Sequence, residues 1–497
     1  MKKTLLSILF IATLGVSISG CSTTKKESFE PNVLKIYNWQ DYIFEGDDEN
    51  DSVIDQFIQY YKEKYDKKIE VEYYTFETNE TMLNVLKTGK SHYDLICPSD
   101  YTIQKMIKEG MVEKIDLSKV PNYSNYVSPY IRNLFEKSKT TNELNEDVSW
   151  SQYSVPYFWG TMGFMYDPLK VHNEEDLKSW DVVWNKNYKG LSTLKDSVRD
   201  TYCAAVFYAY KEELHAIKNQ HDNHEISDEE YTAKITEIMN RKDKKTIQLA
   251  EKALKEAKEN IYGFEVDSGK SDIVTGKIAI NFCWSGDAVY SMDCAEEESD
   301  TYLNYVVPDE GSNIWFDGWV MSKNANKDLA HEFLNFICDP KIASQNMNEV
   351  GYTSAIAGDA VFEMIQEWYQ PEDQTIEEME SNEELYKVDL SWFFGESYDA
   401  QSHFVYSEEI NRQLSAQYPD YETVIRCAIM EDFGEQNEDI LEMWARARSN
   451  SVPLWAWILI AAAVIFVTSK ITIDAVNKHA RNKRIQQKKQ LLNQKNG

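Results

Sequence analysis

The first hundred residues alternate between short apolar runs and amphipathic segments. Residues 33–37 (VLKIY) and 69–74 (IEVEYY) predict strands, the first from its apolar run and the second from its polar–apolar alternation. Residues 51–65 and 79–88 carry apolar side chains at helical spacing and predict helices, and YDLIC predicts a third strand before a helix that ends at Gly110. This strand–helix order predicts a mostly parallel sheet with helices on its faces.

The second half repeats the alternation with longer segments. VPYFWGTMGFMYD predicts strands with a bend at Gly160, and KIAINFCWSGD and YLNYVVPDEG predict further strands. Residues 199–212 and 227–258 predict helices. The charged stretch 211–250 has no strong apolar face at its start and predicts a surface excursion.

The N-terminal segment has the pattern of a secretory signal. Residues 1–21 hold two lysines, an apolar run and small residues before Cys21. The last four of these residues, ISGC, resemble a bacterial lipobox, in which Cys21 would be lipidated and become the mature N-terminus. A plain signal peptide or uncleaved anchor is the alternative. Residues 22–32 then predict a polar linker.

The C-terminal segment predicts a membrane span. Residues 452–469 contain no charged side chain and have the length of a transmembrane helix. The tail 470–497 that follows is basic, which predicts a cytoplasmic tail and an ectodomain outside the cell. A buried core helix is the alternative for 452–469.

The ectodomain is strongly acidic. The formal net charge of the chain is −31, and residues 22–469 hold 42 Lys and Arg against 82 Asp and Glu, a balance of about −40. Such a field attracts cations and repels nucleic acid, although solubility alone also explains it. Six ectodomain cysteines match no zinc spacing; buried free thiols are favoured, and disulfides remain open.

Aromatic and acidic side chains recur where predicted strands end. In open α/β sheets, ligands bind beyond the carboxyl ends of strands. Four loops in such positions pair rings with an acid: Asn38–Trp39–Gln40–Asp41–Tyr42, Pro98–Ser99–Asp100–Tyr101, Trp284–Ser285–Gly286–Asp287 and Ile314–Trp315–Phe316–Asp317–Gly318–Trp319. Rings edged by carboxylates suit a flexible chain of methylenes that carries ammonium groups, because ring faces attract cations and carboxylates pair with them.

These residues carry a family resemblance from about residue 33 to 445. The blocks YNWQDYI, YDLICPSDYTIQKMIKEGMVEKID, INFCWSGDAVYSM and YVVPDEGSNIWFDGWVMSKNANK, in this order, resemble the bacterial spermidine/putrescine-binding proteins of the PotD type. The resemblance implies an α/β, two-lobed type II periplasmic-binding-protein fold with a ligand cleft. It implies lobe 1 over 33–154 with 317–351 returning to it, and lobe 2 over 155–316 and 352–447.

The resemblance also implies a function and a set of ligand contacts. The chain would be the polyamine-binding subunit of an ABC importer, would close its lobes on the cation, and would deliver it to permease and ATPase subunits. The implied contacts are Trp39, Gln40, Asp41, Tyr42, Ser99, Tyr101, Ser197, Asp200, Trp284, Trp315, Asp317 and Tyr352. Asp317 would pair with one terminal ammonium, and Trp284 and Trp315 would stack on the methylenes.

One departure from the family pattern leaves the ligand open. Ser197 stands where the family has an acid, so spermidine and putrescine are both possible ligands. No nucleotide-binding loop, hydrolase motif or metal-spaced cluster occurs in the sequence, so neither an enzyme nor a cofactor is expected. A binding protein for another small solute, and a polyamine sensor that signals through the span, remain alternatives.

Overall fold

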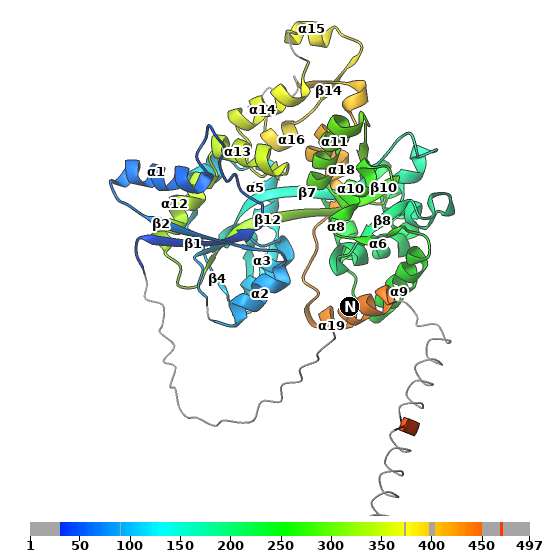
Figure 1. Ribbon diagram of the computed structural model, residues 1–497, viewed down its shortest axis with the longest axis horizontal. Helices are drawn as coiled ribbons and strands as arrows, with labels where there is room; N and C mark the ends of the chain where they lie inside the picture. Colours follow the sequence, from blue (N-terminus) through cyan, green and yellow to red (C-terminus); the bar gives the residue numbers. More distant parts are fainter. Residues whose placement is uncertain (1–29, 90, 372–373, 397–402, 450–467, 471–497) are drawn as a thin grey trace, which may run out of the picture.

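The chain folds around one large mixed sheet. The computed structural model describes residues 30–89, 91–371, 374–396, 403–449 and 468–470. The main strands lie in the order β2-β1-β3-β12-β7-β10-β8-β9. Pairing is parallel within β2-β1-β3 and within β10-β8-β9, and antiparallel where β12 and β7 join these halves. Figure 1 shows the two halves on either side of β7 and β12.

The strands differ greatly in length. The main path comprises β1 (Val33–Trp39), β2 (Glu70–Phe76), β3 (Leu95–Ile96), β7 (Ser154–Tyr166), β8 (Ser192–Lys195), β9 (Gly263–Glu265), β10 (Ile280–Trp284) and β12 (Ser312–Ser322). The strands that pair beside it are β4 (Val112–Glu113), β11 (Asn304–Val306), β13 (Thr353–Ser354) and β16 (Cys427–Ala428). Two small hairpins are β5 (Lys139–Thr141) with β6 (Asp147–Ser149), and β14 (Leu385–Val388) with β15 (His403–Tyr406).

Helices cover the sheet in both halves (Figure 1). The first half carries α1 (Val53–Tyr65), α2 (Asn79–Lys87), α3 (Asp100–Lys108), α4 (Pro121–Tyr126), α5 (Pro129–Lys137), α12 (Lys327–Ile337) and α13 (Pro340–Val350). The other helices are α6 (Val198–Ala209), α7 (Lys211–Asp222), α8 (Asp228–Met239), α9 (Lys244–Lys258), α10 (Ser268–Val274), α11 (Ser285–Ser299), α14 (Asp359–Tyr369), α15 (Ile376–Glu380), α16 (Ser391–Phe394), α17 (Gln413–Gln417), α18 (Tyr421–Ile425) and α19 (Asn437–Arg448). The alternating strand–helix order of the first hundred residues is therefore confirmed.

The two long strands form the buried centre of the molecule. Every residue of β7 and of β12 is buried, as expected for strands covered on both faces. The predicted division of this segment into strands is wrong, because β7 runs without a break from Ser154 through Gly160 to Tyr166. Gly160 instead serves close packing: a Cβ there would lie 2.8 Å from the ring of Trp315 and 2.4 Å from Ser285 Oγ.

The stretch 211–250 is packed more tightly than its charge indicates. It forms α7, α8 and the start of α9, and α9 buries Ile247, Ala250 and Leu254. The helix α9 packs against α6 and α19. The surface excursion predicted here is therefore wrong for α9, whose apolar positions recur at helical spacing among lysines and glutamates.

The predicted attachments to the membrane fall mainly on residues outside those described. These are the signal 1–21 with Cys21, most of the linker, residues 452–467 of the span, and the tail after Lys470. None of the helices within the described ranges combines the length and apolarity needed to cross a bilayer. The six cysteines of the described chain are free, and all except Cys294 are buried.

Candidate functional site

Asp317 lies at an irregularity of β12 and is buried, with 6% of its surface exposed. The pairing register of β12 with β7 shifts between Phe316 and Gly318, and such bulges re-aim a side chain. The Tyr42 hydroxyl donates to Asp317 Oδ2 at 2.6 Å. Within the described chain, Asp317 Oδ1 has no hydrogen-bond partner. An acceptor left unpaired in the interior is costly, so this oxygen is suited to a ligand donor.

The environment of Asp317 changes its acidity. Burial raises the pKa of Asp317 to about 6, and the hydrogen bond from the Tyr42 hydroxyl opposes that increase. No ion pair joins Asp317 to a lysine or arginine among the residues that the structure describes. Asp317 is therefore a buried carboxylate at neutral pH whose charge is stabilised by the Tyr42 hydroxyl and not by a cation.

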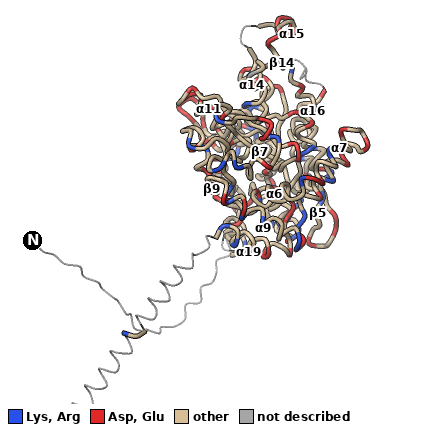
Figure 2. Tube along the Cα trace, turned by 90° about the vertical axis from the view of Figure 1, so that its right-hand side faces the viewer, with Lys and Arg blue, Asp and Glu red and all other residues tan. Residues whose placement is uncertain are grey.

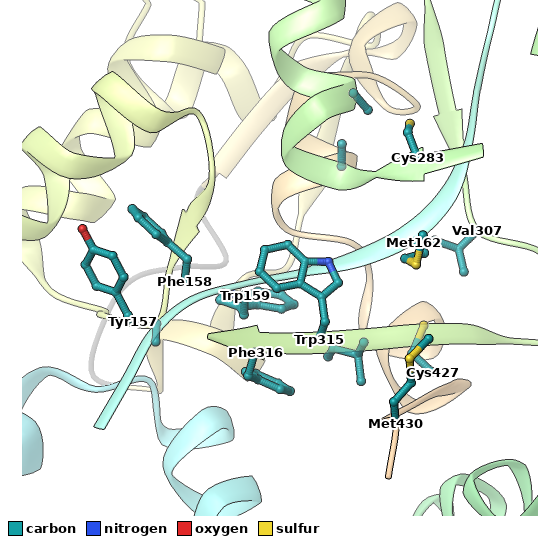
Figure 3. Close-up of a cluster of buried hydrophobic side chains, with 14 of the residues drawn as sticks. Tyr157, Phe158, Trp159, Met162, Cys283, Val307, Trp315, Phe316, Cys427 and Met430 are labelled. Carbon is teal, nitrogen blue, oxygen red and sulfur yellow. The ribbon is translucent and has the colours of Figure 1, made fainter. Parts of the chain in front are cut away.

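Three rings follow one another from the Tyr42 side chain that binds this carboxylate. The centroids of Tyr42 and Tyr352 lie 5.7 Å apart at 89°, and those of Trp315 and Tyr352 lie 5.4 Å apart at 57°. Figure 3 shows the Trp315 and Phe316 side chains on opposite sides of β12, as strand geometry requires. Trp315 Nε1 is buried without a hydrogen-bond partner in the described chain. The cluster Tyr42, Trp315, Asp317 and Tyr352 is called the Asp317 site below.

Tyr352 connects the Asp317 site to the other half of the sheet. Its hydroxyl donates to Asp287 Oδ1 at 3.1 Å, and Asp287 belongs to the first turn of α11. The ring lies directly against Gly286, where an added Cβ would come within 1.6 Å of Tyr352 Cδ1. Glycine at this position is therefore what allows Tyr352 to pack on α11.

A buried lysine lies beyond Asp287. Lys195 ends β8, and its side chain is 1% exposed. Its Nζ lies 3.4 Å from Asp287 Oδ2, 3.4 Å from Glu265 Oε1 and 4.4 Å from the centroid of the Trp284 ring. Burial lowers the pKa of the ammonium, but the carboxylates of Asp287 and Glu265 outweigh burial and raise that pKa above its ordinary value. Lys195 is therefore charged.

A second group of side chains surrounds Arg199 in the first turn of α6. The guanidinium lies 3.7 Å from the Tyr101 ring centroid and 4.4 Å from that of Phe433, and a nitrogen lies 3.6 Å from Asp432 Oδ1. The Tyr101 hydroxyl in turn accepts a hydrogen bond from Asn79 at 2.7 Å. This stack joins α3, α6 and the C-terminal segment.

Asp200 lies beside that stack and faces Lys195. Burial raises the pKa of Asp200 to about 6, while Ser197, Lys195 and Arg199 lower it. Ser197 is the N-cap of α6, and its hydroxyl accepts from the Asp200 amide at 3.5 Å. Ser197 therefore has a structural role at the helix start, whatever else it contacts.

The residues predicted from sequence fall into three places. Tyr42, Ser99, Trp315, Asp317 and Tyr352 are brought together. Trp284 adjoins this group through Lys195, whereas Tyr101, Ser197 and Asp200 form the second group. Trp39 packs on Phe76 at 4.6 Å, and Gln40 and Asp41 are exposed, with the Gln40 amide donating to Asp41 at 3.3 Å.

The sequence interpretation left Asp287, Lys195, Glu265 and Asn79 out of the site. Asp287 had a signal, because it ends one of the four loops that pair rings with acids. Lys195 begins the block KDSVRD, of which the family resemblance assigned only Ser197 and Asp200, and Glu265 had no signal. In the described part of the chain no cluster of His, Cys, Asp and Glu is arranged to hold a metal ion.

The sheet has two parallel halves that are joined by the long antiparallel strands β7 and β12, and buried acids and rings lie on and beside β12. This arrangement defines a two-lobed α/β binding protein of the periplasmic type. Residues 56–371 match the family model of the bacterial extracellular solute-binding protein, and the chain belongs to that family. This is a binding family and not an enzyme family.

Curated and solved relatives agree with this assignment and confirm the resemblance noted in the sequence. The chain is 28% identical over 354 residues to the spermidine/putrescine-binding periplasmic protein of Escherichia coli, covering 71% of this chain and 84% of the relative. It is 28% identical over 367 residues to the putrescine-binding periplasmic protein SpuD of Pseudomonas aeruginosa, with the same coverage of 71% and 84%. The crystal structure of the PotD substrate-binding protein from Streptococcus pneumoniae is 26% identical, with a TM-score of 0.54, over 84% of this chain and 100% of that chain.

Proposed function

We propose that the chain binds a polyamine outside the cell as the substrate-binding subunit of an ABC importer. The observation that carries this proposal is Asp317, a buried carboxylate with one unpaired oxygen, which is bonded to Tyr42 and through it adjoins the rings of Tyr352 and Trp315. A buried ammonium needs a carboxylate partner, and an aromatic face contributes roughly 0.5–2 kcal/mol to a cation. The names of the related proteins, which state spermidine and putrescine binding, support the same ligand class.

The proposed contacts divide the ligand between its charged and its apolar parts. Asp317 Oδ1 accepts from a terminal ammonium, while Trp315 and Tyr352 pack on the methylenes next to it. Asp200 is the proposed partner for an amine nearer to α6. The remaining proposed contacts are those implied by the family: Trp39, Gln40, Asp41, Tyr42, Ser99, Tyr101, Ser197 and Trp284.

The proposed mechanism is capture by closure of two lobes. Lobe 1 would comprise residues 33–154 and 317–351, and lobe 2 residues 155–316 and 352–447. The ligand stabilises the closed state by its higher affinity for that state. The closed receptor then docks on permease and ATPase subunits. A lipid on Cys21 and the apolar segment 452–469 would hold the ectodomain at the outer face of the membrane.

A ligand screen tests this function. The full chain, purified in detergent micelles, is heated with putrescine, cadaverine, spermidine, spermine, amino acids or sugars, and the melting temperature is recorded. A ligand stabilises by RT ln(1 + [L]/Kd), so at least one amine should raise the melting temperature in a concentration-dependent manner. A screen in which only neutral or anionic solutes raise it refutes the proposal.

A further inference from the structure

The surroundings of Lys195 have the composition of an ammonium-binding site. Its Nζ donates to the Val266 carbonyl at 2.7 Å, lies 3.4 Å from Asp287 Oδ2 and 3.4 Å from Glu265 Oε1, and faces the Trp284 ring at 4.4 Å. Carbonyl, carboxylate and ring are the three groups that stabilise a desolvated primary amine. These residues are called the Lys195 cage below. The cage already holds one ammonium, and that ammonium belongs to the chain itself.

The Lys195 cage is continuous with the Asp317 site. Tyr352 contacts Trp315 with its ring and donates its hydroxyl to Asp287, and Asp287 pairs with Lys195. A ligand amine held at Asp317 would therefore extend along Tyr352 toward the cage. A longer ligand that follows this direction meets a fixed positive charge.

The acids near the cage are already balanced by cations of the chain. Asp287 has a second lysine, Lys270, at 3.6 Å from Oδ1, in addition to Lys195. Asp200 faces the charge of Lys195 and of Arg199. Neither Asp200 nor Asp317 forms an ion pair with a lysine or arginine in the described chain, and Asp317 also has no cation of the chain among the groups that shift its pKa. Asp317 therefore offers a ligand a buried carboxylate with no cation of the chain beside it, and Asp200 offers a second one close to Lys195 and Arg199.

We propose that Lys195 is a specificity-determining residue. Its ammonium occupies the position that the amine of a long ligand farthest from Asp317 would take, so the site favours a diamine over a triamine or tetraamine. The amine ligand class rests on the proposed function, whereas the ammonium-binding character of the cage does not. Two like charges at neighbouring positions in a desolvated site repel strongly, and the cage gives the resident charge four partners that a ligand would have to displace.

The selectivity test compares two ligands on three proteins. Titration calorimetry on the full chain gives the ratio of the dissociation constants of putrescine and spermidine for the native protein, for Lys195→Met and for Lys186→Met. Methionine keeps the volume of lysine and removes its charge. Lys186 is exposed on the 3-10 helix Lys186–Tyr188. Its replacement by methionine therefore makes the same change of net charge away from the site. The native protein and Lys186→Met should both bind putrescine more tightly than spermidine. Lys195→Met should shift the ratio of the two dissociation constants at least about tenfold in favour of spermidine.

A rescue experiment tests the cage without any polyamine. In Lys195→Ala the vacated cage should accept a small alkylammonium, so ethylamine or propylamine should raise the melting temperature while propanol should not. If the amines rescue Lys195→Ala but the native protein binds no polyamine, the proposed function is refuted, whereas the ammonium-binding character of the Lys195 cage is supported. An unchanged putrescine/spermidine ratio in Lys195→Met would overturn the selectivity role. Absence of amine rescue, including a Lys195→Ala chain that stays unfolded at every amine concentration, would overturn the cage itself.

Discussion

Replacing Asp317 by asparagine should change stability and ligand affinity in opposite directions. The two side chains have nearly the same shape, and the asparagine carbonyl can still accept from the Tyr42 hydroxyl, which now donates to Asp317 Oδ2 at 2.6 Å. The substitution therefore removes the buried charge and keeps this hydrogen bond. Any change in the stability of the ligand-free protein therefore measures how much the buried charge destabilises the fold.

The pKa gives the size of the stability effect. Burial raises the pKa of Asp317 from the ordinary 3.8 to about 6. Each unit corresponds to 1.36 kcal/mol, so the ionised carboxylate destabilises the ligand-free protein at pH 7 by about 3 kcal/mol. Relaxation around asparagine reduces the gain, so we expect Asp317→Asn to stabilise the ligand-free chain by about 1–3 kcal/mol. Functional sites commonly carry such a cost in stability.

The affinity effect has the opposite sign. Asparagine cannot pair with an ammonium, and the loss of one partner of a buried charge pair costs about 2–5 kcal/mol of binding. Melting curves of the ligand-free chain and titration calorimetry with the best amine from the screen measure the two quantities.

The matched control is Asp300→Asn. Asp300 is exposed and has a φ of 52°, a conformation that asparagine also adopts readily. This control makes the same change of net charge and should alter neither quantity. An Asp317→Asn variant that melts earlier than the native chain, or that binds every amine with native affinity, would refute the assignment of Asp317.

Three further perturbations follow from the same contacts. Lowering the pH through about 6 protonates Asp317, so the rise in melting temperature caused by the amine should shrink between pH 7 and 5. Over the same interval the ligand-free chain should gain stability from this group, because the folded form binds the proton more tightly than the unfolded form does. Both trends should be weaker in Asp317→Asn. Gly286→Ala places a Cβ 1.6 Å from Tyr352 Cδ1 and should destabilise the chain by about 1–3 kcal/mol and weaken amine binding in calorimetry, whereas Gly263→Ala, whose Cβ meets nothing within 4 Å, should do neither. Tyr42→Phe removes the donor to Asp317, so it should destabilise the chain by about 1–3 kcal/mol and move the loss of binding above pH 6; a titration curve with an unchanged midpoint would exclude this role for the hydroxyl.

The sequence predicted the parts of the site that depend on strand ends. In the sheet, β3 lies between β1 and β12. The isolated bridge between Ser99 and Asp317 connects the loop after β3 to β12. Local hydrophobic patterns place the ends of β1 and β3, and the parallel pairing of these strands brings Tyr42 and Ser99 to one edge. The loop predicted over Ile314–Trp319 is wrong, because these residues lie inside β12, where Asp317 stands at the register shift between Phe316 and Gly318. The pattern did not predict the surroundings of Asp41, whose positive φ of 52° belongs to a turn in which the side chain is exposed.

The Lys195 cage could not be predicted because its members are distant in sequence and unremarkable in context. Lys195, Glu265 and Asp287 come from β8, β9 and α11, and their contact depends on the pairing of β8 with β9 and β10. A lysine followed by an aspartate is typical of a solvated turn. Gly160 shows the same limit, since a glycine within an apolar run favours a bend until the partner ring of Trp315 is known.

Net charge and buried charge have different roles in selecting a cation. Acidic side chains occur on separate elements across the molecule, including α11 and α15, so the field of a chain with a net charge of −31 attracts cations of every length (Figure 2). Such a field favours spermine over putrescine, because attraction grows with ligand charge. The interior opposes this order: each ligand ammonium that enters must lose its water, and only a carboxylate without a resident cation compensates that loss. With Asp287 and Glu265 already paired to Lys195, each ligand charge beyond the two proposed at Asp317 and Asp200 gains less than it loses. Salt screens the surface field and hardly affects the buried pairs. Raising the ionic strength should therefore weaken spermine binding more than putrescine binding. Equal weakening of the two, measured by calorimetry at two salt concentrations, would contradict this division of roles between surface and buried charge.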